Sequence, residues 1–218
     1  MSKYPEKDSL IYRLYRTRLI SELTHSQFWF LKKELKICRS VLDIGCGADS
    51  PLRYCKIPYS IGVDAYKPAI REARTRGTHN GYIIAEINNL ELKPNSFDAV
   101  VLIEVLEHLD KDKGKRLLEK IEQWAKKKVL ISCPNGYLPQ GPQRGNPYQV
   151  HRSGWDIEEM TSRGYKAYGM VGLRWKPSRF LFFPLALWAV ISVMLQNLTY
   201  RFPKMAFEVF YVKEKKAK

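Results

Sequence analysis

Cysteine is scarce in this chain: the 218 residues contain four, and no two of them form a C-x-x-C pair or another metal-ligand spacing. This pattern excludes a cysteine-ligated zinc site and gives no sign of a disulfide framework. The first residues are charged and lack the apolar segment of a secretory signal peptide. We therefore expect a cytoplasmic protein with reduced thiols.

Acidic residues are few at both ends of the chain, although the whole carries a net charge of +15. Residues 1–39 hold nine basic and four acidic residues, and residues 163–218 hold eleven and two. Residues 40–162 are nearly neutral, with 17 basic and 16 acidic residues. Basic flanks favour anionic partners such as a phosphorylated substrate, acidic lipid head groups or nucleic acid. A basic surface without a specific partner is the alternative.

Long apolar runs are also lacking, with one exception of sixteen residues at 180–195. As a helix this run reaches about 24 Å, short of the roughly 30 Å hydrocarbon core of a bilayer. It also lies between the last two predicted strands, which a single crossing would separate. We therefore expect a buried or self-associating insert, an apolar substrate pocket, or a segment that dips into a membrane surface. Basic residues and Trp188 make residues 174–204 suited to an anionic membrane surface.

The most informative feature that is present is the stretch VLDIGCGA at residues 41–48. A short apolar run ends on Asp43 and breaks into a Gly-x-Gly turn, which is how a buried parallel strand meets a nucleotide-like ligand. A dinucleotide fingerprint needs a third glycine, but Ser50 and Pro51 follow here. Asp43 would also repel a pyrophosphate, whereas a ligand that carries a sulfonium and an ammonium group suits it.

Alternating elements along the chain predict an α/β sheet with helices on both faces. Helices are expected near 9–37, 51–55, 68–75, 111–126 and 154–163, and Gly164 is expected to close the last of them. Strands are expected near 40–44, 60–64, 81–85, 98–103, 128–132, 165–171 and 206–212.

Four ordered motifs, VLDIGCGA, IGVDAY, NSFDAVVLIEVLEHL and KVLISCPNG, resemble those of the class I S-adenosylmethionine-dependent methyltransferases of the type 11, or UbiE-like, group. The resemblance implies a Rossmann-like, seven-stranded, mostly parallel sheet with a closing antiparallel hairpin. It implies a methyltransferase domain over 40–218, with the hydrophobic insert 174–204 between the last two strands. It also implies an N-terminal helical lid segment over 1–39, although packing alone would explain helices there.

The same resemblance implies a set of residues that bind the cofactor S-adenosylmethionine. The glycine turn should line the methionine part, Asp64 should take the ribose hydroxyls, and the next two residues should lie beside the adenine. Glu86 is the expected acid near the adenine amino group, with Asn88 in reserve, and Glu104 should face the reaction centre. The predicted cofactor residues are Asp43, Gly45, Cys46, Gly47, Asp64, Ala65, Tyr66, Glu86, Ile87 and Glu104.

Methyl transfer from a sulfonium needs alignment above all, and a hydroxyl acceptor also needs a base or a metal to remove its proton. Glu104, His108 and His151 are the candidate catalytic residues, whereas His25 and His79 are expected on the surface. A structural role for His108 beside its helix is the alternative. No metal is expected, because Glu-Val-Leu-Glu-His is widespread in class I enzymes without one.

The metal alternative comes from a second resemblance. Glu104, Glu107, His108 and the later His151 resemble the metal-binding set of small-RNA 2′-O-methyltransferases, and quinone-biosynthesis O-methyltransferases share part of it. Two carboxylates and two imidazoles suit a divalent ion beside an acceptor oxygen. The sequence around 133–155 also resembles small bacterial and archaeal methyltransferases linked to surface-glycan or lipid modification.

A loop rich in proline, glycine and glutamine spans residues 133–150 and should form an acceptor-site wall through Tyr137, Asn146 and Tyr148. The leading interpretation is a methyltransferase for a small-molecule or lipid- or glycan-linked acceptor, working at or near a membrane surface. An RNA methyltransferase is less favoured, because no RNA-binding module is recognisable. A non-catalytic cofactor-binding scaffold and a dehydrogenase complete the alternatives.

Overall fold

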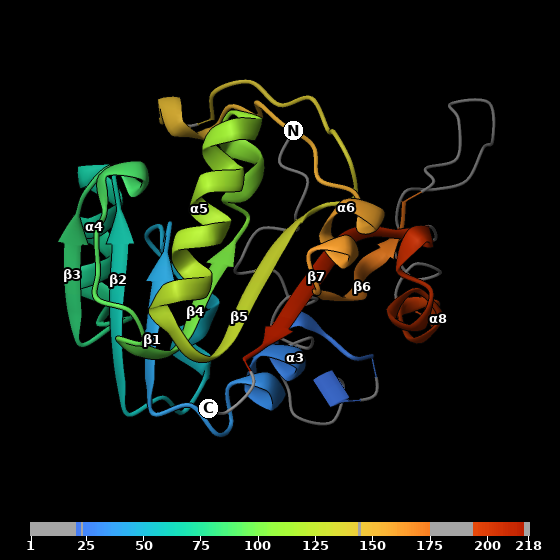
Figure 1. The fold of residues 1–218 in the computed structure, drawn as a ribbon, viewed down its shortest axis with the longest axis horizontal. Helices are drawn as coiled ribbons and strands as arrows, with labels where there is room; N and C mark the ends of the chain where they lie inside the picture. Colours follow the sequence, from blue (N-terminus) through green and yellow to red (C-terminus); the bar gives the residue numbers. More distant parts are fainter. Residues whose placement is uncertain (1–20, 23, 144, 175–193, 216–218) are drawn as a thin grey trace.

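The computed structural model describes residues 21–22, 24–143, 145–174 and 194–215. Its centre is a seven-stranded sheet with the strand order β3-β2-β1-β4-β5-β7-β6 (Figure 1). The strands are β1 (Ser40–Ile44), β2 (Tyr59–Asp64), β3 (Gly81–Ile84), β4 (Phe97–Ile103), β5 (Ala125–Pro134), β6 (Lys166–Leu173) and β7 (Ala206–Glu214).

The first five strands are parallel, and β7 runs antiparallel to both of its neighbours, β5 and β6. This arrangement confirms the mostly parallel Rossmann-like sheet and the closing antiparallel hairpin. All residues from Val41 to Ile44 and from Asp98 to Leu102 are buried, as expected for strands covered on both faces. The chain order reverses between β1 and β4, and ligands of such sheets bind outside the carboxyl ends of the strands at this point.

Four of the described α-helices lie where the sequence predicts helices and differ from the prediction in length, whereas α8 was not predicted. They are α3 (Gln27–Glu34), α4 (Lys67–Arg76), α5 (Lys111–Trp124), α6 (Ile157–Ser162) and α8 (Gln196–Arg201). The helix expected at 51–55 is a 3-10 turn, η1 (Pro51–Tyr54). The helix expected from 154 begins only at Ile157, because the Asp156 side chain accepts a hydrogen bond from Glu159 N and caps it. Gly164 follows its last turn with φ +87°, as predicted.

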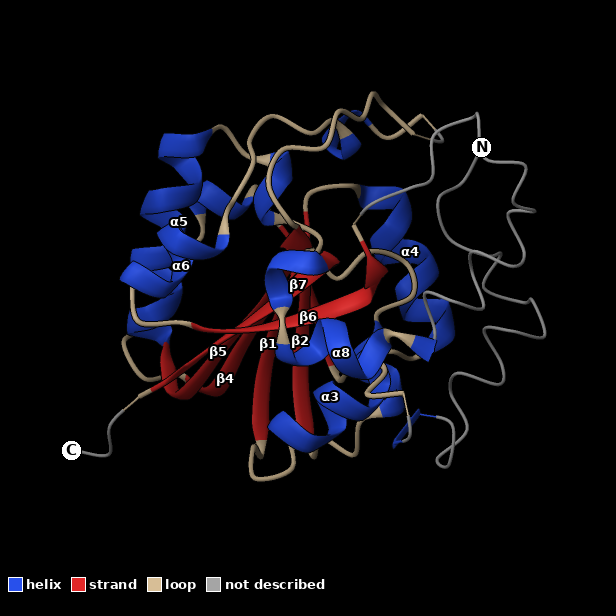
Figure 2. Cartoon of the chain, turned by 90° about the vertical axis from the view of Figure 1, so that its right-hand side faces the viewer, coloured by secondary structure: helices blue, strands red, loops and turns tan. Residues whose placement is uncertain are grey.

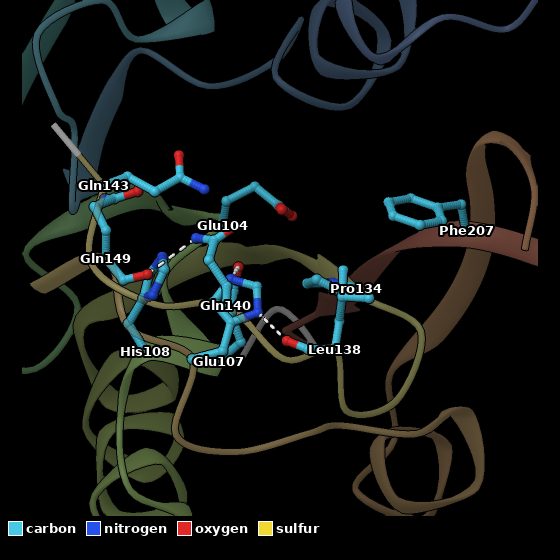
Figure 3. A pocket seen from close by; sticks show the side chains of 10 residues that line it. Glu104, Glu107, His108, Pro134, Leu138, Gln140, Gln143, Gln149 and Phe207 are labelled. Atoms are coloured by element: carbon cyan, nitrogen blue, oxygen red, sulfur yellow. Dashed lines mark hydrogen bonds and ion pairs between the residues drawn. The ribbon is translucent and has the colours of Figure 1, made fainter. Parts of the chain in front are cut away.

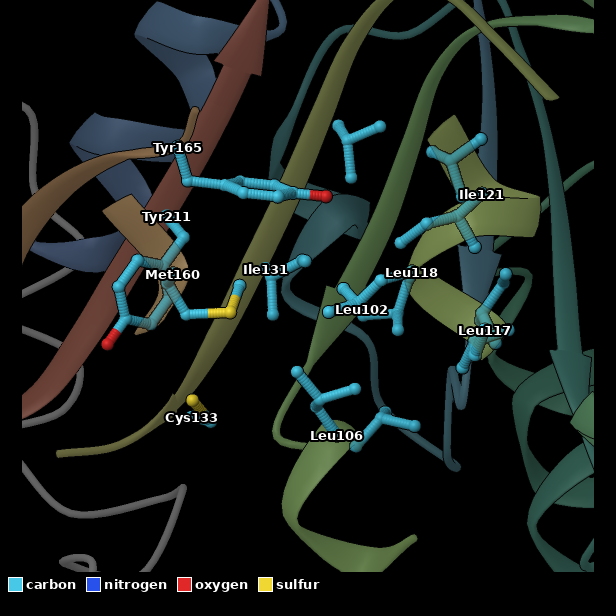
Figure 4. Close-up of a cluster of buried hydrophobic side chains, with 14 of the residues drawn as sticks. Leu102, Leu106, Leu117, Leu118, Ile121, Ile131, Cys133, Met160, Tyr165 and Tyr211 are labelled. Carbon is cyan, nitrogen blue, oxygen red and sulfur yellow. The ribbon is translucent and has the colours of Figure 1, made fainter. Parts of the chain in front are cut away.

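Two hydrophobic clusters hold the layers together. The first lies between the sheet and the helices α5 and α6, where Leu117, Leu118 and Ile121 of α5 pack against Leu102 and Ile131 (Figure 4). The second lies on the other face, under α3. Figure 2 shows α5 and α6 on one side of the sheet and α3 and α8 on the other. The second cluster includes Phe30, Leu31, Leu35, Val41, Val101, Leu130 and Phe210.

The N-terminal segment and the apolar insert are described only in part. Residues 1–20 and 175–193, which hold most of the predicted lid and of the apolar run, lie outside the described residues. The helix α3 packs on the sheet through Phe30, whose ring lies 5.2 Å from that of Phe210. Within the described part, no helix is long and apolar enough to cross a membrane.

The end of the insert is fixed to the sheet by one buried side chain. Gln196 of α8 accepts a hydrogen bond from Gly172 N at 2.9 Å and donates one to Gly169 O at 3.2 Å. A Cβ atom at Gly169 would lie 2.1 Å from Thr199 O, so only glycine lets α8 approach β6 this closely. The insert therefore returns to the sheet beside its last strand pair.

Candidate active site

A tight turn follows β1 at the point where the chain order reverses. Gly45 N and Cys46 N both donate to Val63 O of β2, at 2.7 and 3.0 Å. Gly45 has φ +71°, and a Cβ atom there would lie 2.3 Å from Val105 Cγ2. Gly47 has φ +57° and faces open space. Residues 45–47, the glycine turn, thus form a cradle that only small residues leave open to a ligand.

The acid at the end of β2 fixes this turn. Asp64 Oδ2 accepts a hydrogen bond from Gly47 N at 2.9 Å, and its Oδ1 accepts one from Tyr66 N at 2.8 Å. Burial raises the pKa of the Asp64 carboxyl above its usual value, the backbone hydrogen bonds oppose that shift, and the charge of Asp43 adds to it. Asp64 therefore organises the turn and presents a partly desolvated carboxylate beside it.

A cavity opens next to the glycine turn, and we call it the turn cavity. Six of the ten predicted cofactor residues line it, namely Gly45, Asp64, Ala65, Glu86, Ile87 and Glu104. Cys46, Gly47 and Tyr66 do not line it, although they border residues that do. The other lining residues are Asn88, Val105, His108, Leu109, Asn146, Tyr148 and Gln149, of which only Asn88 was considered for the cofactor.

Asp43 also stays outside the turn cavity, in a buried polar cluster behind it. Its Oδ2 accepts a hydrogen bond from Ser50 Oγ at 2.5 Å and lies 3.2 Å from His79 Nε2. The expectation of a surface position for His79 was wrong: its side chain is fully buried, and its Nδ1 lies 3.0 Å from Ser60 Oγ. The His79 ring therefore lies beneath the turn beside the carboxylate, although its Nε2 makes no hydrogen bond within the described residues.

Glu104 follows β4 in a strained conformation. Its φ is +55°, which non-glycine residues rarely adopt. Its N–H donates to Ser132 O and Ser132 Oγ, at 3.0 and 3.2 Å, and the Ser132 hydroxyl donates to Glu104 Oε1 at 3.1 Å. Strained backbone of this kind clusters at functional sites. The neighbouring strand therefore fixes the Glu104 carboxylate where it lines the turn cavity.

A second cavity of about 170 Å³ adjoins the first, and we call it the histidine cavity. Figure 3 shows glutamate and glutamine side chains gathered on one side of it and Pro134, Leu138 and Phe207 on the other. Glu104, His108 and Gln149 line both cavities. The remaining lining residues are Glu107, Gln140, Gln143 and His151.

Both histidines of this cavity are oriented by backbone carbonyls. His108 Nδ1 lies 3.2 Å from Val150 O, and His151 Nδ1 lies 2.6 Å from Leu138 O. A carbonyl can only accept, so we infer that each Nδ1 carries the proton and each Nε2 has the lone pair. Burial lowers the pKa of His108 to about 4, and the charge of His151 contributes in the same direction. His108 is therefore neutral at pH 7.

Glu107 is the most unusual group of the site. It is 2% exposed, and neither carboxylate oxygen has a hydrogen-bond partner in the described part of the chain. Burial raises its pKa well above the usual value, and the charges of Glu104 and Glu208 raise it further. One ligand atom each from Glu107, His108 and His151 lies within 4.8 Å of the others. Three of the four candidate metal ligands thus come together, and Glu104 lines the same cavity.

The loop after β5 divides its residues differently from the prediction. Tyr137 is exposed and lines neither cavity, whereas Asn146 and Tyr148 line the turn cavity and not the histidine cavity. Gln140, Gln143 and Gln149 were not predicted, although the richness of this loop in glutamine was the available signal. Trp155 anchors the end of the loop, because its Nε1 donates to Leu106 O at 3.3 Å and its ring packs against Gly114.

The depressed pKa of His108 predicts a pH-dependent stability. The unfolded chain binds a proton at His108 near pH 6.5, and the folded protein binds it only near pH 4, so stability falls as pH drops from 6.5 to 4. The upper limit of this loss is about 3 kcal/mol. Urea unfolding of the wild type and of His108→Gln at pH 7 and pH 5 should show a flatter pH dependence for the variant. Parallel pH dependences would contradict the assignment.

Comparison with known proteins supports the prediction that the glycine turn belongs to a methyltransferase domain. The sequence matches the family model described as a methyltransferase domain over residues 42–133. No curated protein shows significant sequence similarity to the chain.

Solved structures share the fold at low sequence identity. A SAM-dependent methyltransferase from Archaeoglobus fulgidus is 20% identical, with a TM-score of 0.55 over 90% of this chain and 98% of that one. The plantazolicin methyltransferase BpumL, solved with SAH, is 18% identical, with a TM-score of 0.53 over 98% and 92%. The methyltransferase domain of the bacterial protein CtHen1 is 17% identical, with a TM-score of 0.54 over 87% and 97%.

The family match covers the strands that carry the glycine turn, Asp64 and Glu104. A Cβ at Gly47 would point into open space, and the acid at the end of β2 lies beside it, so the residues present fit an adenosyl cofactor. The chain is an enzyme with a methyltransferase domain over residues 42–133, it shares the fold of S-adenosylmethionine-dependent methyltransferases, and its cofactor is S-adenosylmethionine.

Proposed function

We propose that this enzyme transfers the methyl group to a hydroxyl oxygen of a small-molecule or lipid- or glycan-linked acceptor. The observation that carries the proposal is the sharing of Glu104, His108 and Gln149 by two adjoining cavities. The turn cavity is the candidate cofactor site, and the histidine cavity is the candidate acceptor site. When bound, S-adenosylmethionine supplies an activated methyl group on a sulfonium, and the chain must then orient the acceptor beside it.

The polar side of the histidine cavity suits a hydroxyl acceptor. An unprotonated His108 Nε2 at the border of the two cavities can accept a hydrogen bond from the hydroxyl and then its proton. The Glu104 carboxylate is the second group at this border that can accept a hydrogen bond from the hydroxyl. The apolar side formed by Pro134, Leu138 and Phe207 would hold a ring or another apolar part of the acceptor. An amine acceptor needs no such base once it is neutral, so this arrangement favours oxygen.

A divalent ion is a second way to activate the same hydroxyl, and the buried Glu107 favours it. A carboxylate without hydrogen bonds is costly to bury, whereas a bound cation offsets that cost. Glu107, His108 and His151 would hold the ion, whose chemistry would be to lower the pKa of a bound hydroxyl. Backbone carbonyls that orient both imidazoles are the usual support of histidine ligands. A metal-assisted reaction, including one on an RNA 2′-hydroxyl, is therefore the second candidate.

The described end of the insert supports an acceptor at a membrane surface. Met194, Leu198, Phe202 and Met205 are exposed just before, on and just after α8. Arg201 and Lys204 lie in the same segment, so apolar and basic groups occur together as they do in interfacial helices. We propose that this part of residues 174–204 lets the enzyme approach an acceptor in an anionic membrane.

An acceptor screen tests these proposals. The purified enzyme is incubated with methyl-labelled S-adenosylmethionine and one of three acceptors: catechols, lipid-linked sugars in anionic vesicles, or short RNA duplexes. Each incubation is run with Mn²⁺ and with a chelator. Label in a lipid-linked sugar, together with flotation of the enzyme with anionic vesicles, would support the leading proposal. Metal-dependent label in RNA would replace it with the second candidate, and label on nitrogen would refute both.

A further inference from the structure

The loop after β5 touches both cavities through one short turn. Pro147–Gln149 forms the 3-10 turn η4, which the Asn146 side chain caps by accepting a hydrogen bond from Tyr148 N at 2.9 Å. Tyr148 lines only the turn cavity, whereas the next residue, Gln149, lines both. A displacement of this turn would therefore change the cofactor side and the acceptor side together.

On the side of the histidine cavity, the turn is fixed by hydrogen bonds to His108 and to the loop residue Gln140. Val150 O lies 3.2 Å from His108 Nδ1, and Gln149 O accepts a hydrogen bond from Gln140 Nε2 at 2.9 Å. Further along, Arg152 N and Ser153 N both donate to Glu107 O, at 2.8 and 3.1 Å. The end of the loop is thus tied to the segment that carries the candidate catalytic residues.

On the cofactor side the turn has a single described side-chain link to the rest of the molecule. The Tyr148 hydroxyl donates a hydrogen bond of 2.5 Å to Glu86 Oε1, which follows β3, 62 residues earlier in the chain. Tyr148 is 43% exposed, so packing does little to hold its ring in place. Glu86 lines the turn cavity and has a second oxygen, Oε2, which can accept a donor from a bound ligand.

We propose that Tyr148 is a positioning residue that couples the cofactor site to the acceptor site through Glu86. This inference rests on the proposed use of the turn cavity by the cofactor. A ligand that fixes Glu86 would fix its partner Tyr148 and, through η4, the wall of the histidine cavity formed by Gln149. Cofactor binding would then complete the acceptor site, so that the cofactor binds before the acceptor.

Calorimetric titration with S-adenosylhomocysteine tests the link without needing an acceptor. We expect Tyr148→Phe to weaken binding about fivefold, because it removes one partly exposed hydrogen bond to a charged group. Glu86→Ala should weaken binding more. In the double variant, Tyr148→Phe should add no further loss, because the hydroxyl acts through Glu86. Tyr59→Phe, at a comparably exposed tyrosine on β2 that lines neither cavity, is the matched control and should bind as the wild type does.

Hydrogen exchange gives a readout that a purely local contact would not change. In the wild type, S-adenosylhomocysteine should slow exchange of the backbone amides in residues 137–150, and in Tyr148→Phe this protection should be lost at saturating ligand. Equal protection in the wild type and in Tyr148→Phe would overturn the coupling. So would a Tyr148→Phe substitution that weakens ligand binding equally in the wild-type and Glu86→Ala backgrounds. Neither outcome would affect the proposed function. Failure of the wild type to bind the ligand would overturn both.

Discussion

Replacing Asp64 with alanine is expected to weaken the binding of S-adenosylmethionine by about 1–3 kcal/mol, or roughly 5- to 150-fold. Two effects act in the same direction. The variant loses the carboxylate that lines the turn cavity, and it also frees Gly47 N and Tyr66 N, which Asp64 now holds at 2.9 and 2.8 Å. The glycine turn would then have to be ordered by the ligand. Calorimetric titration of the purified variant measures the loss.

A matched control separates cofactor binding from stability. Asp98 is also a mostly buried acid that accepts a backbone hydrogen bond, from Arg39 N at 2.8 Å, but it lies at the opposite end of the parallel strands, near the start of β4. Asp98→Ala should lower the unfolding temperature and leave the affinity for S-adenosylmethionine unchanged. A folded Asp64→Ala protein with wild-type affinity would remove Asp64 from the cofactor site.

The ends of the parallel strands could be predicted because each end is marked within one short segment. An apolar run that ends at an acid or a glycine turn marks the carboxyl end of a buried strand, and such ends place Gly45, Asp64 and Glu104 at the same edge of the sheet. Three residues from three strands therefore meet in the turn cavity as expected. The same logic gave all seven strands within a few residues.

The lining of the histidine cavity could be predicted only in part: Glu104, Glu107, His108 and His151 were candidates, whereas its glutamine and apolar residues were not. Phe207 reaches it from β7, and Gln140 and Gln149 reach it from a loop whose path depends on anchoring by Trp155. No local pattern encodes these long-range contacts. The predicted contact of Tyr148 with the acceptor stays a prediction, because a loop residue can face either of two adjoining cavities and Tyr148 lines the turn cavity.

His79 shows a different limit. A histidine just before a predicted strand looks exposed in the sequence, and nothing in its neighbours indicates otherwise. Its burial follows from Gly62, where a Cβ atom would lie 2.6 Å from the His79 ring, and from the hydrogen-bond partner Ser60. A glycine in one strand thus makes room for a side chain that arrives 17 residues later.

The second large effect is expected at Glu107, where replacement by glutamine should stabilise the metal-free protein at pH 8 by about 1–3 kcal/mol, because the neutral amide removes the cost of a buried negative charge. The folded pKa of Glu107 lies above its unfolded value, so the wild type is favoured below about pH 4.5 and loses stability as pH rises from there. Glutamine does not titrate, and the advantage of the variant should therefore grow with pH. Urea unfolding at pH 5 and pH 8 in the presence of a chelator measures it.

A matched variant shows whether the gain comes from the missing partner. Glu34 is also buried, but it accepts a hydrogen bond of 2.8 Å from Lys128, so Glu34→Gln should destabilise the protein under the same conditions. A destabilised Glu107→Gln protein would mean that Glu107 has a partner which the described residues do not show.

If the metal-assisted reaction is correct, a divalent metal should make the wild type more stable than Glu107→Gln. An ion that binds only the folded wild type stabilises it by about 2.7 kcal/mol at a free concentration of 100 times its Kd. Glu107→Gln loses the anionic ligand between His108 and His151 and should gain much less from Mn²⁺. The decisive observation is whether the wild type becomes more stable than Glu107→Gln as the Mn²⁺ concentration rises. If Glu107 is only an unfavourable buried carboxylate, the variant should have the larger free energy of unfolding at every Mn²⁺ concentration. In that case no metal takes part, and proton removal from the acceptor rests on His108 and Glu104.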